Sequence, residues 1–119
     1  MSSFDHEKLK VYQLSIDLVV LVDDVVERLP KGRAYLADQL QRAATSVPLN
    51  IAEGAGEYSR QEKNRFYRMA KRSGTECAAI FNVCDRLRLI EKAQYEKSRE
   101  LLVHIVNMLT KLAKTSGAP

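Results

Sequence analysis

The chain has 119 residues, of which 45% are hydrophobic and 29% are charged, and its formal net charge is +4. This length suits one domain with a core of its own, and this composition argues against a disordered chain. The longest apolar run, residues 18–22, is too short to span a membrane, and the N-terminus lacks the regions of a signal peptide, so we expect a cytoplasmic protein.

The charge is distributed unevenly along the chain. Residues 1–30 carry six acids against three bases, whereas residues 31–89 carry eleven bases against six acids. The chain is therefore acidic at its start and basic in its middle.

A first helix is predicted over residues 7–28, and its apolar face is unusually wide. One apolar row at helical spacing comprises Val11, Leu14, Leu18, Leu21, Val25 and Leu29, and an adjacent row comprises Tyr12, Ile16, Val19, Val22 and Val26. A helix that packs on one core needs a narrower face. We therefore expect this helix to contact a second surface as well, most often another subunit, which predicts a homo-oligomer.

A second helix is predicted over residues 33–54, although Pro48 lies inside it. Proline removes one helical hydrogen bond and costs about 3 kcal/mol within a helix. Polar and apolar rows nevertheless keep their register across Pro48, which favours one helix with a kink at that residue. The polar row comprises Gln39, Arg42, Ser46, Asn50 and Glu53.

Two interpretations of this polar row stay open. It is either a solvated helix face or a network in which Arg42 and Glu53 satisfy each other. In the second case, Asn50 and Glu53 would hold the kinked helix against its neighbours.

The third helix is predicted over residues 60–88. Ser59 and Glu62 have the spacing of a capping box, in which each side chain satisfies a backbone N–H at the start of a helix. A heptad follows through Phe66, Ala70, Ser73, Cys77, Ile80, Cys84 and Leu87. Several of these residues are small, so a neighbouring helix can approach closely.

A fourth helix, over residues 92–114, repeats the heptad through Tyr95, Ser98, Leu102, Ile105, Leu109 and Leu112. Four long helices with short connections predict an all-α, up-down-up-down four-helix bundle formed as one domain by residues 1–119.

No catalytic constellation is evident, so we expect a non-enzymatic protein without a cofactor or metal. Cys77 and Cys84 are two helical turns apart, too far for a disulfide within one chain, and are expected to be small buried hydrophobic residues. A metal-dependent hydrolase or nuclease is a third alternative, and it would have to depend on Glu53 or Glu62.

Six bases lie within thirteen residues at the start of the third helix, with only Glu62 against them. They are Arg60, Lys63, Arg65, Arg68, Lys71 and Arg72. Helical spacing predicts that they face outward, where they form either a solvated face or a surface for nucleic acid. Arg42 could extend this surface. Only Tyr58 and Tyr67 are near enough to stack on bases, so contacts to the phosphate backbone are the expected mode.

Several motifs together resemble a known family. They are Gln39-Leu-Gln-Arg42-Ala-Ala, Ser46-Val-Pro48-Leu-Asn50-Ile-Ala-Glu53-Gly54 and Ser59-Arg-Gln-Glu62, followed by Arg65-Phe66 and by Ser73 with Glu76. The chain resembles the bacterial four-helix-bundle proteins encoded in intervening sequences of 23S ribosomal RNA genes. That family is similar to the accessory variability protein of diversity-generating retroelements.

This resemblance implies a ring-like homopentamer with a basic surface that binds nucleic acid, and no catalytic residues. In the retroelement branch it also implies a reverse transcriptase as partner. The family usually has arginine where this chain has Gln41 and again near Glu57, and glycine where this chain has Arg72. The leading hypothesis is thus an oligomeric protein that binds RNA or DNA backbone through Arg42 and the six bases. The alternative is a structural or protein-interaction module whose basic face is only solvated.

Overall fold

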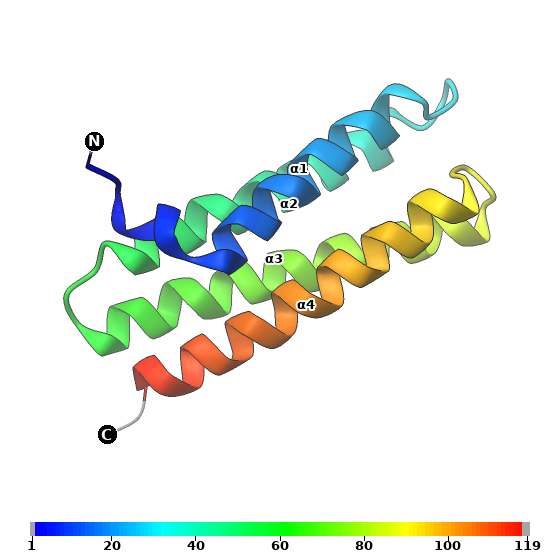
Figure 1. The fold of residues 1–119 in the computed structure, drawn as a ribbon. Coiled ribbons are helices and arrows are strands. Elements are labelled where there is room, and N and C mark those ends of the chain that lie inside the picture. Colours follow the sequence, from blue (N-terminus) through cyan, green and yellow to red (C-terminus); the bar gives the residue numbers. More distant parts are fainter. Residues whose placement is uncertain (1, 118–119) are drawn as a thin grey trace.

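The computed structural model describes residues 2–117, and all the regular elements in this range are helices (Figure 1). A short 3-10 helix, η1 (Asp5–Lys8), precedes four long helices, α1 (Lys10–Glu27), α2 (Ala34–Ala55), α3 (Arg60–Arg86) and α4 (Lys92–Gly117). Each long helix runs antiparallel to the one before it, so η1 and the end of α4 lie at the same end of the molecule (Figure 1). The predicted four-helix bundle is confirmed.

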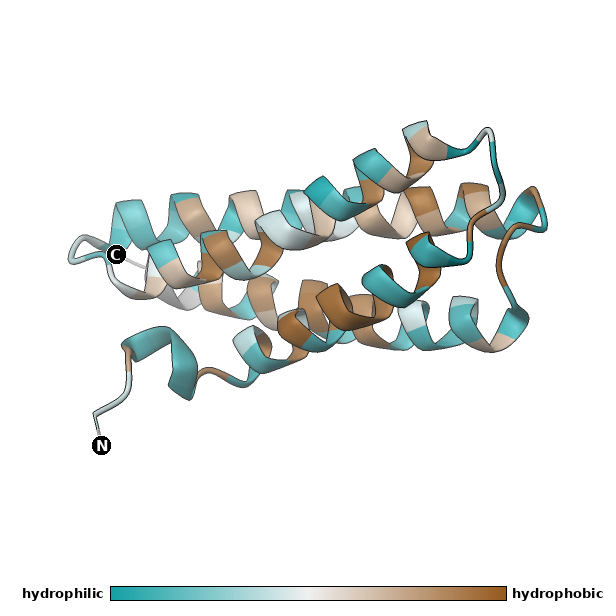
Figure 2. Cartoon of the chain, turned by 90° about the horizontal axis from the view of Figure 1, so that it is seen from above, coloured by the Kyte–Doolittle hydropathy of each residue, from teal (hydrophilic) through white to brown (hydrophobic). Residues whose placement is uncertain are grey.

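The apolar rows of the four helices meet in one core. Figure 2 shows hydrophobic residues recurring along all four helices, and the buried ones among them form one cluster. The most deeply buried large side chains, each at most 1% exposed, include Leu18, Leu40, Ile51, Phe81 and Ile105. Within residues 2–117, no helix combines the length and apolarity that crossing a membrane requires.

The start of the first helix differs from the prediction. Residues 5–8 form the separate helix η1, Leu9 is extended with φ −85° and ψ 127°, and α1 begins only at Lys10. Within η1 the Glu7 carboxylate accepts a 2.7 Å hydrogen bond from the Phe4 N–H. The His6 ring lies 5.7 Å from the ring of Phe4 and 4.6 Å from that of Tyr12. These contacts stabilise a turn that periodicity alone does not reveal.

The wide apolar face of α1 is only partly covered within this chain. Val11, Leu18 and Val25 are buried, but Ile16 is 39% exposed and Val20 is 64% exposed. Since these two residues are one turn apart, they form an apolar strip on the outside of the bundle.

α2 runs through Pro48 as one helix, as predicted. Pro48 and its neighbour Val47 are buried, and Ile51, about one turn later, is fully buried. The hydroxyl of Thr45 donates to the carbonyl of Gln41. The proposed kink at Pro48 stays a prediction.

α3 ends at Arg86, two residues earlier than predicted, in a left-handed turn. Arg88 has φ 58°, the N–H of Leu89 donates to the carbonyl of Cys84, and the N–H of Arg88 donates to that of Asp85. This is the hydrogen-bond pattern of a Schellman motif, in which glycine usually occupies the left-handed position.

Replacing Arg88 by glycine is therefore expected to raise the free energy of unfolding by about 0.5–1 kcal/mol. Glycine avoids the Cβ clash of the left-handed conformation, and this gain exceeds its larger loss of backbone entropy. Urea unfolding measures the change. Lys97→Gly, in the middle of α4, is the control and is expected to lower stability by about 1 kcal/mol. A loss of stability in Arg88→Gly would contradict this account of the turn.

Candidate nucleic-acid interface

Three of the predicted bases share one open hollow on α3. Arg68, Lys71 and Arg72 line it together with Thr75, Glu76 and Ala79, and its volume is about 640 Å³. These six residues recur at spacings of three and four, or adjoin one another, so a single face of α3 presents them to solvent. Glu76 is the one acid among them.

The cationic groups of this hollow are largely uncommitted. Within residues 2–117, neither Lys71 nor Arg72 forms an ion pair or a side-chain hydrogen bond. Arg68 donates to the amide oxygen of Asn64 at 3.1 Å when that amide is turned to satisfy both of its neighbours. These side chains can thus bind an anionic partner without first giving up an ion pair.

Lys63 has a different environment from the one predicted. Its ammonium is half-buried rather than outward-facing, and it donates to the carbonyls of Gly54 at 3.1 Å and of Ala55 at 3.0 Å. Those carbonyls belong to the last turn of α2, where the helix dipole favours a positive charge. Lys63 therefore joins α3 to the end of α2.

Arg65 is exposed but held in place. Its Nε lies 2.8 Å from Oε2 of Glu62, and its guanidinium lies 4.6 Å above the centre of the Phe66 ring. Glu62 thus contacts Arg65, and of the predicted capping box only the bond from the Glu62 N–H to the Ser59 hydroxyl is confirmed, at 3.0 Å.

The remaining two predicted bases lie apart from the hollow. Arg60 is the exposed first residue of α3, two turns before Arg68, and Arg42 is exposed on α2. The structure therefore brings together Arg68, Lys71 and Arg72, with Arg65 one turn away on the same helix.

The polar row of α2 forms a network, but not the predicted one. Asn50 donates to the hydroxyl of Ser46 at 2.9 Å and to its carbonyl at 2.9 Å, and the Ser73 hydroxyl donates to that of Ser46 at 2.9 Å. This partly buried triad links α2 to α3. The pairing of Arg42 with Glu53, which was one of the two open interpretations, does not form within this chain: both are exposed, and eleven residues of helix separate them by about 16 Å.

α2 and α3 approach each other closely at Gly54. A Cβ at this position would lie 2.8 Å from Cε1 of Tyr67 and 3.2 Å from Cβ of Phe66. Tyr67 is only 4% exposed, and desolvation raises the pKa of its phenol. The expectation that Tyr67 is near enough to stack on bases is therefore wrong, and Tyr58 alone of the two tyrosines is exposed.

Both cysteines are buried hydrophobic residues, as predicted. Cys77 and Cys84 are free thiols with 0% exposure. Burial, with a smaller contribution from the charge of Glu76, raises the pKa of Cys77 to about 12, and burial raises the pKa of Cys84 as well. Among the described residues, no group of three or more His, Cys, Asp or Glu side chains is placed to hold a metal ion.

Comparison with known proteins agrees with this architecture. The model of the family described as 23S rRNA-intervening sequence protein matches residues 7–111. The fold is similar to the crystal structure of a protein of unknown function from the S23 ribosomal protein family of Bacteroides thetaiotaomicron. The TM-score is 0.80 at 22% identity, over 87% of this chain and 95% of that chain. None of the curated proteins compared with the chain matches it. The chain belongs to the 23S rRNA-intervening sequence protein family.

Proposed function

We propose that this protein is a non-enzymatic, cytoplasmic oligomer that binds the phosphate backbone of RNA or DNA through the outward face of α3. The observation that carries the proposal is the hollow that Arg68, Lys71 and Arg72 line together, where none of the three forms an ion pair within the described part of the chain. When a protein binds nucleic acid without sequence specificity, most of the affinity comes from lysine and arginine side chains that replace the counterions of the phosphates.

The surroundings of the hollow favour backbone contacts over base recognition. No aromatic residue lines it. Tyr67 is buried against Gly54, which leaves Tyr58 in the α2–α3 connection as the exposed aromatic side chain nearest in sequence to the basic residues. Stacking on unpaired bases needs several such rings, so binding with little sequence preference is expected.

Oligomerisation would place several copies of this weakly binding surface on one particle. The exposed strip of Ile16 and Val20 is the proposed contact between subunits, and the family resemblance implies a homopentamer. Ile16→Asp combined with Val20→Asp is expected to lower the particle mass measured by light scattering, because charges are costly in a buried interface. Circular dichroism shows whether the helices remain. An unchanged oligomer mass in a folded variant would contradict the proposal that the exposed strip on α1 is the contact between subunits.

The alternative proposal is a protein-interaction module, with a reverse transcriptase or another protein as partner. The exposed apolar strip on α1 supports this alternative, because an apolar face docks proteins as well as further subunits. Binding through such a face responds little to salt, whereas phosphate contacts weaken steeply.

The acid within the hollow offers a test of the nucleic-acid proposal. Glu76→Gln is expected to raise the affinity for labelled duplex DNA roughly threefold to tenfold at 0.1 M salt, because it removes a negative charge near the phosphates. Glu100→Gln on α4 makes the same change in net charge outside the hollow, and is expected to have a much smaller effect. Fluorescence anisotropy measures both. Equal effects of the two variants would count against the hollow as the binding surface.

A further inference from the structure

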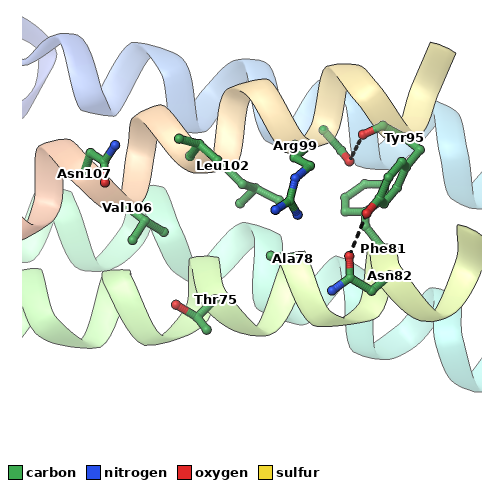
Figure 3. A pocket seen from close by; sticks show the side chains of 11 residues that line it. Thr75, Ala78, Phe81, Asn82, Tyr95, Arg99, Leu102, Val106 and Asn107 are labelled. Atoms are coloured by element: carbon green, nitrogen blue, oxygen red, sulfur yellow. Dashed lines mark hydrogen bonds between the residues drawn. The ribbon is translucent and has the colours of Figure 1, made fainter. Parts of the chain in front are cut away.

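A second hollow lies between α3 and α4 (Figure 3), and it adjoins the basic one at Thr75. Its volume is about 270 Å³, and apolar side chains make up much of its lining, including Phe81, Leu102 and Val106. Ala78 on α3 faces this space and is too small to fill it, so the hollow arises where a larger residue would have closed the gap between the helices. A site of this size suits a molecule smaller than a typical drug.

Most polar groups of this pocket are already satisfied. The Tyr95 hydroxyl donates to Oδ1 of Asn82 at 2.9 Å, and the Ser98 hydroxyl donates to the carbonyl of Tyr95 at 2.6 Å. Figure 3 shows the first of these bonds closing one end of the pocket. These contacts fix the part of the wall that Asn82, Tyr95 and Ser98 form.

Arg99 differs from the other polar groups of the pocket in its charge. It is the single charged residue of the lining, and Figure 3 shows its side chain extending from α4 toward Ala78 on α3. Within residues 2–117 its guanidinium has no ion-pair or hydrogen-bond partner. A guanidinium presents paired N–H donors that match the two oxygens of a carboxylate.

We propose that this pocket binds a small organic monoanion with an apolar body, such as an aryl or short alkyl carboxylate. The carboxylate pairs with Arg99, and the hydrocarbon part lies against Phe81, Leu102 and Val106. A bare phosphate would leave the apolar walls unused, and a neutral hydrocarbon would leave Arg99 unpaired. This site does not depend on the proposed nucleic-acid function, because Thr75 is the one residue that lines both hollows and the proposed anion contacts do not involve it.

The test is titration of the isotope-labelled protein with phenylacetate and with neutral phenylacetamide, followed by amide NMR shifts. Saturable shifts confined to residues 75–82 and 95–107 are expected with phenylacetate, and phenylacetamide is expected to bind at least tenfold more weakly. Arg99→Gln should abolish this preference. Ala78→Leu, which fills the pocket, should abolish binding of both probes.

Arg72→Gln is the matched control, because it removes an exposed arginine from α3 outside the pocket and should leave both titrations unchanged. If Ala78→Leu does not fold, the comparison of Arg99→Gln with Arg72→Gln still decides the matter. The proposal is overturned if phenylacetate causes no saturable shifts at millimolar concentration, or if the acid and the amide bind equally. Shifts that follow protein concentration instead of probe concentration would assign the pocket to a second copy of this chain, and would overturn it too.

Discussion

Neutralising the three bases of the α3 hollow, by replacing Arg68, Lys71 and Arg72 together with glutamine, is expected to weaken binding of duplex DNA about 10²- to 10³-fold at 0.1 M salt. Each phosphate contact contributes about 0.9 to the slope of log affinity against log salt, and hence close to one decade of affinity at this concentration. The three residues are uncommitted or nearly so within the fold, so their loss should leave the bundle intact. Fluorescence anisotropy measures the affinity, and circular dichroism checks the helices.

The control for this variant removes the same charge from other surfaces. Lys10, Lys31 and Lys97 are exposed on α1, in the α1–α2 connection and on α4. Their joint replacement by glutamine is expected to weaken the binding of duplex DNA far less than the triple replacement in the hollow does, because distant surface charges are largely screened. Similar losses in the two triple variants would mean that net charge, and not the α3 hollow, governs binding.

Replacing Gly54 by alanine is expected to lower the free energy of unfolding by about 1–3 kcal/mol. The added Cβ would lie 2.8 Å from a ring carbon of Tyr67, which is buried and cannot turn aside without disturbing the core. Forcing extra volume into a packed interior costs this much through displaced side chains and backbone. The contact lies beside the carbonyls that Lys63 holds, so the variant should also loosen the end of α2.

Gly74→Ala provides the matched control within the same bundle. Gly74 is also a buried helical glycine, but its added Cβ would lie 3.5 Å from Cγ2 of Val106, an ordinary contact distance. Alanine has the higher helix propensity, so this variant is expected to gain up to about 1 kcal/mol. Urea unfolding of both variants decides the matter, and effects of the same sign would contradict the close approach at Gly54.

The fold could be predicted because its determinants are local and periodic. Many of the heptad residues that the sequence places on one side of α3 and α4, such as Cys77, Cys84 and Ile105, are buried, whereas Leu87, just after the end of α3, is 45% exposed. Ser59 caps α3 as its spacing to Glu62 suggests. Register across Pro48 was sufficient to predict one helix, because a helix with its apolar row on a core tolerates the loss of one hydrogen bond.

The site was only partly predictable because its details depend on contacts between helices. Lys63 has the spacing of an outward base, yet the nearby end of α2 offers its ammonium two carbonyls. Ser46 and Ser73 lie 27 residues apart and meet only in the bundle. The pocket beside Arg99 arises from a gap at Ala78. No pattern within one helix reveals the residues that lie across from it.

The most direct test of the nucleic-acid proposal is the affinity of the unmodified protein for labelled structured RNA and duplex DNA across a salt series. Three phosphate contacts from one subunit predict that log affinity falls with log salt with a slope of about −2.7, and a steeper slope if several subunits contact one molecule. Affinity that hardly changes with salt, or no binding at low salt, would contradict the proposal and direct attention to a protein partner.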